Sequence, residues 1–274
     1  MKEKVTIEKG TVQETLMLPL YGRYMANQRY PQLFKDVAAK KIIDRIDYNI
    51  GKADMGKGPQ IVYGLRQDLT ARSASRFLEK YPEAIVVNIG CGLDTIFSHI
   101  DNGKCRLVNI DFPEVIQFRQ KLFDSNDRIT DIGMDANNLE WMDRVGYQEG
   151  DHVFLMSCGV LMYFQRPQVK KLINEIGKHF PGAVFCFDYE NARMLARSNK
   201  AVRKTGNNGA LMPFSMEDGE KEIKEFSDTV DYVIPLKALP KEYDVLPFIY
   251  RTYFNRVFRS GAMVLVDVKF KEAV

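Results

Sequence analysis

One stretch of the sequence, from Ile85 to Val115, constrains the fold more than any other. It begins with the apolar run IVVNI, continues through the glycine turn GCGLDT, and ends in RLVNID, a second apolar run that closes on a carboxylate. Short apolar runs bounded by glycine are typical of buried strands in a parallel sheet. The stretch therefore predicts a strand, a tight turn, a helix and a second strand.

The turn between the two strands carries residues suited to contact a ligand. Gly90 and Gly92 allow the backbone to turn tightly and to approach a ligand where a Cβ would clash. Asp111 lies 21 positions after Gly90, and about 20 is the spacing expected for an acid that binds the ribose hydroxyls. This spacing indicates an adenosine ligand, although a Gly-x-Gly alone also fits an ordinary strand-to-helix turn.

The residues after the second glycine distinguish between adenosine ligands. A dinucleotide fingerprint requires Gly or Ala at position 95, where this chain has Thr95, preceded by Asp94. A carboxylate beside a pyrophosphate would be repelled by about 4 kcal/mol at an effective dielectric constant of ~20. The cationic sulfonium of S-adenosylmethionine raises no such conflict. The turn therefore favours this cofactor, and a nicotinamide dehydrogenase is the weaker alternative.

Composition limits the class of protein further. The chain has 274 residues, 45% of them hydrophobic and 27% charged, which suits a single α/β domain with insertions, residues 1–274. The net charge of +3 comes from interleaved charges, so we expect neither a nucleic-acid nor a membrane partner. The first residues lack an apolar run, which argues against a signal or a membrane span. A monomer or homodimer is expected.

The cysteines and histidines suggest neither disulfides nor metal. The four cysteines form no C-x-x-C pair and suit reduced thiols in a cytoplasmic protein: they are Cys91, Cys105, Cys158 and Cys186. The three histidines have no partners at metal-ligand spacing, so we expect no metal.

Helices are expected before the glycine turn and alternating elements after it. Residues 1–80 are predicted to form an N-terminal helical extension, with helices over 11–28 (where Pro19 should kink or begin a helix), 37–46 and 67–80. Further helices are predicted over 114–123 and 167–179, and further strands over 128–133, 152–157, 183–189, 232–236 and 262–270. This alternation predicts a mostly parallel sheet with helices on both faces. The polar, irregular segment 191–230 is predicted to be a cap insertion, or else a solvated excursion.

Ligands of open parallel sheets lie beyond the carboxyl ends of the strands, so residues that follow strands are candidates for binding. These are Gly90 to Asp94, then Asp111 and Phe112, then Asp135 to Asn137, and finally Ser157 to Gly159. Asp135 could accept a hydrogen bond from an adenine amino group, although taken alone it also fits a helix N-cap or a solvated acid.

The chain resembles the leucine carboxyl methyltransferase family, including its bacterial small-molecule O-methyltransferases. Four segments, within roughly Thr11 to Tyr189, carry the resemblance: residues 14–36, residues 42–50, the pair VVNIGCGLDT and NIDFPEVI, and SCGVLMYF at 157–164. The resemblance implies a class I methyltransferase fold, a Rossmann-like sheet of seven strands whose last strand is antiparallel, with bound S-adenosylmethionine.

The resemblance also implies roles for individual residues. Arg72 matches the arginine that holds the methionine carboxylate, a task that suits a bidentate guanidinium, although it also fits a helix-surface residue. Arg23 matches a position near the cofactor tail or the substrate entrance. The other implied cofactor contacts are Gly90, Cys91, Gly92, Asp94, Asp111, Phe112, Asp135, Ala136, Ser157 and Cys158. Relatives commonly carry Glu at the position of Cys158, and a thiol cannot replace its charge.

These observations predict an S-adenosylmethionine-dependent O-methyltransferase that acts on a carboxylate or hydroxyl of a small molecule such as a secondary metabolite. A carboxylate acceptor needs no general base, and the strand-end segments contain no histidine. Candidates for the acceptor pocket are Tyr21, Arg23, Tyr163 and residues 199–214, although both tyrosines could equally be packing residues. The alternatives are methylation of a protein's terminal carboxylate, and a cofactor-binding protein that has lost transferase activity.

Overall fold

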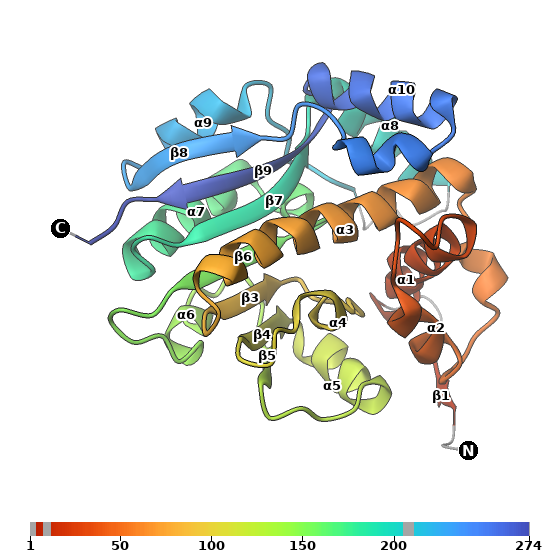
Figure 1. Cartoon of the computed structure of the whole chain (residues 1–274), viewed down its shortest axis with the longest axis horizontal. Helices are drawn as coiled ribbons and strands as arrows, with labels where there is room; N and C mark the ends of the chain where they lie inside the picture. The colour runs from red at the N-terminus through yellow and green to blue at the C-terminus, as the bar shows by residue number, and fades with distance from the viewer. Residues whose placement is uncertain (1–3, 8–11, 205–210, 274) are drawn as a thin grey trace. The chain divides into compact units, whose positions relative to one another are not determined.

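The computed structural model describes residues 4–7, 12–204 and 211–273, and it divides the chain into two compact units (Figure 1). The first unit is Met1–Ala136 and the second is Asn137–Val274.

Three parallel strands form the sheet of the first unit, in the order β5-β4-β3. The elements of this unit are β1 (Val5–Thr6), α1 (Val12–Arg29), α2 (Val37–Ile43), β2 (Ile46–Asp47), the 3-10 helix η1 (Ile50–Ala53), α3 (Lys57–Lys80), β3 (Ile85–Ile89), α4 (Phe97–Ile100), β4 (Arg106–Asp111), α5 (Pro113–Leu122) and β5 (Ile129–Gly133). All five residues of β3 are buried, as an apolar run in a parallel sheet requires. Ile89 pairs with Ile110, so β3 and β4 end side by side.

The helices before β3 differ in extent from the predicted ones. α1 continues through Pro19, so no helix begins at that residue. α2 ends at Ile43 rather than Ile46, because Ile46 instead pairs with Val5 in a small parallel sheet. α3 begins at Lys57, ten residues before the predicted start, because Gly58 and Pro59 lie in its first turn, where proline is tolerated.

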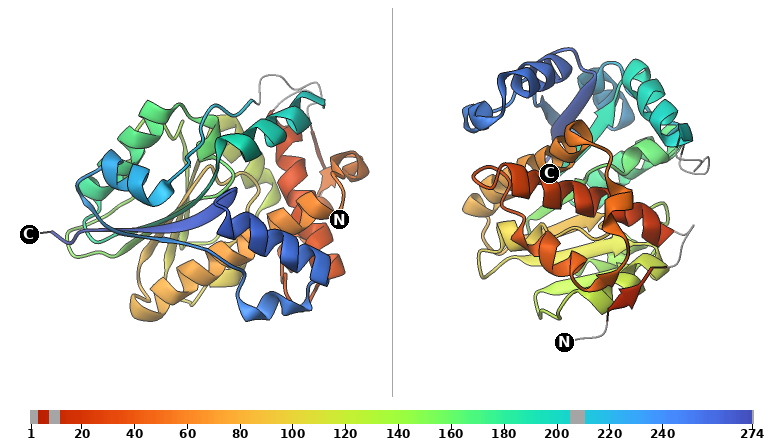
Figure 2. Two further views of the ribbon diagram at one scale, coloured as in Figure 1. Left: turned by 90° about the horizontal axis from the view of Figure 1, so that it is seen from above. Right: turned by 90° about the vertical axis from the view of Figure 1, so that its right-hand side faces the viewer.

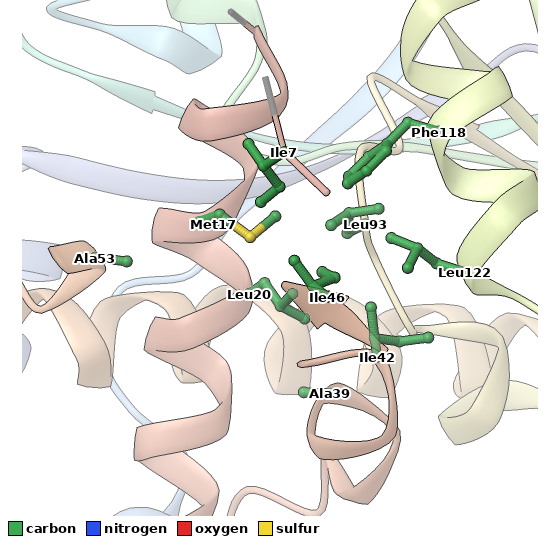
Figure 3. Close-up of a cluster of buried hydrophobic side chains, with 10 residues drawn as sticks. All are labelled: Ile7, Met17, Leu20, Ala39, Ile42, Ile46, Ala53, Leu93, Phe118 and Leu122. Carbon is green, nitrogen blue, oxygen red and sulfur yellow. The ribbon is translucent and has the colours of Figure 1, made fainter. Parts of the chain in front are cut away.

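A hydrophobic cluster joins these helices to the rest of the first unit (Figure 3). Met17 and Leu20 from α1 meet Phe118 and Leu122 from α5 in this cluster. Leu93, from the glycine turn, lies among them (Figure 3) and is 3% exposed. The turn is therefore anchored in apolar packing as well as in the sheet.

The second unit contains four strands in the order β6-β7-β9-β8. Its elements are α6 (Trp141–Arg144), β6 (Val153–Ser157), the 3-10 helix η2 (Leu161–Tyr163), α7 (Arg166–His179), β7 (Val184–Glu190), α8 (Ala192–Lys204), α9 (Gly219–Phe226), β8 (Val230–Pro235), the 3-10 helix η4 (Lys241–Val245), α10 (Phe248–Arg259) and β9 (Met263–Phe270). β6 and β7 are parallel, whereas β9 runs antiparallel between β7 and β8, as the dark blue strand in Figure 1 shows. The expectation that the last strand is antiparallel is confirmed.

Two helices occupy the segment that was expected to be irregular, residues 191–230. α8 places Leu195 against Met162 and Met212, and α9 buries Ile223 and Phe226. A narrow apolar stripe is enough to dock a helix, so a polar composition did not exclude one. The GNNG sequence at 206–209 lies outside the described residues.

The sequence also gave no sign of α10, which runs directly into β9 (Figure 2). Phe248 and Ile249, in its first turn, are both 72% exposed. Apolar residues on the solvent side blur the helical period, which explains why the helix was missed.

The predicted fold class is confirmed: the protein is an α/β protein with a seven-stranded, mostly parallel sheet. Over the described ranges, no helix combines the length and the apolar character that a membrane span would need. Residues 4–7, 12–204 and 211–273 also contain no cluster of three or more acidic, cysteine or histidine side chains arranged to hold a metal ion.

Candidate active site

The loop that follows β3 is fixed by its glycines and by the end of β4. Gly90 and Gly92 have φ values of 70° and 46°, which L side chains rarely adopt. The backbone N–H groups of Gly90 and Cys91 both donate to the carbonyl of Ile110, at 2.8 and 3.1 Å. A Cβ at Gly92 would also lie 3.1 Å from Leu16 Cδ2, a tight contact, so glycine is favoured here chiefly for its backbone conformation.

Asp111 closes β4 and holds this loop through its carboxylate. Its Oδ2 accepts from the Gly92 N–H at 2.7 Å, and its Oδ1 accepts from the Phe112 N–H at 2.8 Å. Burial raises the pKa of Asp111 above its ordinary value of 3.8, against the opposing effects of these two hydrogen bonds and of the Arg119 charge. The carboxylate sits at the junction of two strand ends, where the sequence placed it.

Arg119 reaches the same loop from α5. Its side chain is 4% exposed, and Nη1 donates to the carbonyls of Gly92 at 3.1 Å and Asp94 at 2.7 Å. The guanidinium carbon lies 3.8 Å from the centre of the Phe123 ring, and Nε lies 3.8 Å from Asp131 Oδ1. A buried positive charge therefore binds two loop carbonyls at once.

Arg23 reaches the loop from α1. Its Nη2 donates to the carbonyl of Leu93 at 2.8 Å, and its Nε donates to Asp36 Oδ2 at 3.0 Å. The Arg23 and Asp36 side chains are 7% and 2% exposed, so this is a buried ion pair. Consecutive loop carbonyls, from Gly92 to Asp94, are thus bound by two arginines from different helices.

Asp36 is the centre of a buried polar network. It is the N-cap of α2, with Oδ1 accepting from the Ala39 N–H at 3.0 Å and from the Thr95 hydroxyl at 2.8 Å. Burial alone would raise the pKa of Asp36, but the neighbouring His99 side chain, the Arg23 charge and the Thr95 hydrogen bond together hold the pKa well below its ordinary value. The carboxylate is therefore ionised at neutral pH.

The end of the loop is bound to α3 through Gln67. Gln67 Nε2 donates to Thr95 Oγ1 at 2.8 Å and to Asp94 Oδ1 at 3.2 Å. Asp94 Oδ1 also accepts from the Ile96 N–H at 2.8 Å, two residues further along the chain. Asp94 thus bridges the loop to the start of α4.

The other candidates in the first unit are spread over several elements. Arg72 lies on α3, where Nε donates to Asp68 Oδ2 at 2.8 Å, and its side chain is 34% exposed. Tyr21 packs against the hydrophobic cluster of Figure 3, which fits its reading as a packing residue. Phe112 is 44% exposed, Asp135 is exposed, and Ala136 is buried. Arg23 donates a hydrogen bond to the Leu93 carbonyl of the loop, and the Phe112 N–H donates to Asp111.

Ser157, Cys158 and Tyr163 lie in the second unit. Ser157 is buried at the end of β6, Cys158 is half-buried, and Tyr163 is 47% exposed. The pKa of the Cys186 thiol lies well above its ordinary value, chiefly because of a hydrogen bond with Cys158 and secondly because the thiol is buried. The Gly159 N–H donates to Asp188 Oδ1 at 2.5 Å, which fixes the turn after Cys158.

Sequence reasoning missed Asp36, Gln67, Thr95 and Arg119. The position of Asp36, directly before the apolar helical run that begins at Val37, is an N-cap signal. Arg119 and Gln67 gave no such signal, because each lies within a helix and meets the loop only after the chain has folded.

Comparison with known proteins identifies the family. The model of the leucine carboxyl methyltransferase family matches residues 16–177, more than half of the chain. The chain is 25% identical over 204 residues to the tetracenomycin polyketide synthesis O-methyltransferase TcmP of Streptomyces glaucescens, covering 73% of this chain and 75% of that protein.

Two solved structures show the same fold. A DUF574 family protein from Streptomyces avermitilis aligns with a TM-score of 0.60 at 14% identity, covering 92% of this chain and 96% of that one. The plantazolicin methyltransferase BpumL, solved in complex with a triazolic desmethylPZN analog and S-adenosylhomocysteine, aligns with a TM-score of 0.51 at 12% identity, covering 95% of this chain and 100% of that one. The predicted family is confirmed, and the chain belongs to the leucine carboxyl methyltransferase family of S-adenosylmethionine-dependent methyltransferases.

Proposed function

We propose that this protein is an S-adenosylmethionine-dependent O-methyltransferase that acts on a carboxylate or hydroxyl of a small molecule such as a secondary metabolite. The observation that carries the proposal is the glycine loop bound to Asp111, in a chain that is similar over most of its length to a polyketide O-methyltransferase. Within this proposal the protein acts in the cytoplasm as a monomer or homodimer, and its partner is the methyl acceptor.

Asp111 fits the ribose of the cofactor. Each carboxylate oxygen already accepts one backbone N–H, which leaves acceptor capacity for two hydroxyl groups. The neighbouring ring of Phe112 is 44% exposed and offers an apolar face to the adenine, with Asp135 and Ala136 following the next strand. Gly90, Cys91 and Gly92 would lie beneath the methionine part of the cofactor.

The remaining cofactor contacts are assigned by the family resemblance. Arg72 would hold the methionine carboxylate. Its guanidinium would then bind this carboxylate together with Asp68, or give up its hydrogen bond to Asp68. Asp94 would steady the loop, as its hydrogen bond to the Ile96 N–H supports. Ser157 and Cys158 would complete the set from the end of β6.

Bound S-adenosylmethionine supplies an activated methyl group, so the protein needs chiefly to align the acceptor and to exclude water. A carboxylate acceptor is already ionised at neutral pH and needs no base, whereas a phenol needs help with its proton. Tyr21, Arg23 and Tyr163 remain the candidates near the acceptor. Burial raises the pKa of Tyr21, so its hydroxyl stays protonated at neutral pH and cannot accept the proton of a phenol. A carboxylate acceptor is therefore favoured.

A second candidate function follows from Cys158, where relatives commonly carry Glu. A thiol that hydrogen-bonds to Cys186 supplies no fixed negative charge, which favours a protein that keeps the cofactor and transfers no methyl group.

Calorimetry with S-adenosylmethionine and S-adenosylhomocysteine, together with a methyl-transfer assay on small carboxylates, phenols and a peptide ending in a free carboxylate, separates these functions. Turnover on a small molecule supports the O-methyltransferase, peptide turnover supports a protein carboxyl methyltransferase, and binding without turnover supports the second candidate.

The first mutational prediction concerns the ribose contact. Asp111→Ala should weaken S-adenosylhomocysteine binding by about 1.5–3 kcal/mol, the scale of hydrogen bonds to a charged group. Calorimetric titration measures the change, and Asp127→Ala, an exposed aspartate in the same unit, serves as the matched control. Unchanged affinity in the Asp111 variant would rule out the ribose assignment.

Cofactor affinity should also depend on pH. Because the pKa of Asp111 is raised above 3.8, the carboxylate becomes protonated at a higher pH than an ordinary aspartate and then loses half of its acceptor capacity. The affinity for S-adenosylhomocysteine should therefore fall as the pH is lowered from neutral through this raised pKa. Asp111→Asn should flatten this profile, and an equally steep profile in that variant would assign the titration to another group.

A further inference from the structure

The carbonyl groups of residues 92–94 are bound by buried cations from two separate helices. Arg119 on α5 binds the carbonyls of Gly92 and Asp94, and Arg23 on α1 binds the carbonyl of Leu93. Both arginine side chains are less than one-tenth exposed. Each guanidinium forms charge-assisted hydrogen bonds in a region from which water is excluded, where such bonds are strong.

The opposite side of the same peptide groups is bound to Asp111. The Gly92 N–H donates to Asp111 Oδ2, while the Gly92 carbonyl accepts from Arg119. The orientation of residue 92 is therefore set from both sides, and rotation of either peptide plane would break a charge-assisted bond. Because Gly92 has the freedom to adopt many backbone conformations, these bonds are what select one of them.

The two arginines differ in what holds them. Arg119 contacts Phe123 and lies near Asp131, both within the segment from α5 to β5. Arg23 is bound to Asp36, the N-cap of α2, and Leu93 inserts its side chain between α1 and α5 (Figure 3). The docking of α1 and α2 therefore determines whether the Leu93 carbonyl has its partner.

We propose that Arg119 and Arg23 are positioning residues for cofactor binding, which act through the loop on Asp111 and couple the docking of α1 to cofactor occupancy. This inference rests on the proposed function of the loop as the cofactor site. A coupling between two sites acts equally in both directions. Docking of α1 should therefore raise the affinity for the cofactor, and bound cofactor should stabilise the docking of α1.

The test is a double-mutant cycle on cofactor affinity. Arg119→Met keeps most of the side-chain length and removes the charge. Arg119→Lys keeps the positive charge but lacks the planar set of N–H donors of a guanidinium. We expect Arg119→Met to weaken S-adenosylhomocysteine binding about tenfold or more, the scale of charged hydrogen bonds, and Arg119→Lys to recover part of the loss. Arg23→Met should behave similarly.

The combination with Asp111→Asn separates positioning from direct contact. If Arg119 acts through Asp111, the double variant Arg119→Met and Asp111→Asn should bind much better than the product of the two single losses implies. Arg128→Met is the matched control, since Arg128 also donates to a backbone carbonyl, that of Cys105, and forms an ion pair, yet does not touch the loop. This variant should bind as the wild type does.

Hydrogen exchange provides a measurement that does not depend on the variants folding. In the wild-type protein, S-adenosylhomocysteine should slow exchange in peptides from α1 as well as from residues 90–94. The inference would be overturned if the cofactor slowed exchange only in residues 90–94. It would also be overturned if the affinity losses of the two single variants were additive in the double variant, or if Arg119→Met bound S-adenosylhomocysteine as tightly as the wild type. A wild-type protein that does not bind the cofactor would instead overturn the proposed function.

Discussion

Asp36→Asn is expected to lower the free energy of unfolding by about 3–5 kcal/mol, because it removes the counter-charge of a buried arginine. The Arg23 and Asp36 side chains are 7% and 2% exposed, so water cannot replace the missing carboxylate. Asparagine keeps the size of the side chain and one acceptor oxygen for the Ala39 N–H and the Thr95 hydroxyl. The decrease in the free energy of unfolding therefore measures the contribution of the Asp36 charge rather than that of its side-chain shape.

Urea unfolding of the variant and the wild type measures this effect. Asp44→Asn is the matched control: Asp44 forms an ion pair with Lys40, but the side chains are 58% and 53% exposed, and such surface pairs contribute about 0–1 kcal/mol. Equal losses in the two variants would contradict the buried ion pair.

The effect of Asp36→Asn should also depend on pH in a defined direction. The pKa of Asp36 is lower in the folded chain than its ordinary value of 3.8, so its stabilisation is fully present above that value. It is lost as the pH falls below 3.8 toward the folded pKa. The difference between the wild type and Asp36→Asn should accordingly narrow in acid, and a difference that is constant from pH 7 to pH 3 would exclude this origin.

Leu93→Ala is expected to cost about 2–5 kcal/mol of stability, the usual range for removing a buried leucine side chain. Leu93 is 3% exposed and packs in the cluster of Figure 3, which also holds Met17, Leu20 and Phe118. The substitution leaves a cavity behind the loop while keeping its backbone hydrogen bonds. We also expect weaker cofactor binding, because the carbonyl of the same residue is held by Arg23.

Thermal and urea unfolding with and without S-adenosylhomocysteine measure both consequences of Leu93→Ala. Ile249→Ala removes the same class of side chain at a position that is 72% exposed, and it should change stability by no more than about 0.5 kcal/mol. A Leu93 variant as stable as this control would show that the cluster refills the cavity.

The parts of the molecule that could be predicted from the sequence are those whose signals are local. The apolar run of β3, the glycines of the turn and Asp111 all lie between positions 85 and 111, and their pattern predicted the strand, turn and second strand that the structure contains. That Asp111 binds a ribose stays a prediction. Strands β6, β7 and β9 of the second unit were found for the same reason, because they are mostly buried and buried strands are continuous apolar runs. Their boundaries agree with the structure to within about two residues, in line with how secondary-structure limits are assigned.

The parts that were missed depend on contacts between distant residues. Arg119 is an unremarkable member of a helical pattern until α5 folds against the loop, and Gln67 meets Thr95 across 28 residues. The helix predicted over 67–80 omitted the first ten residues of α3, whose first turn contains Gly58 and Pro59. Whether the chain is one domain stays a prediction, since the structure describes two compact units separately.

The hydrogen bond from Arg23 to the Leu93 carbonyl spans 70 positions in the chain, which has a consequence for how the protein folds. The hydrogen bond from the Gly90 N–H to the Ile110 carbonyl spans only 20 positions and can form early, whereas the arginine contact must wait for a large loop to close. We therefore expect the loop that follows β3 to acquire its final rigidity late, after the strands have assembled. A refolding chain should accordingly regain its sheet, seen by circular dichroism, before it regains affinity for S-adenosylhomocysteine.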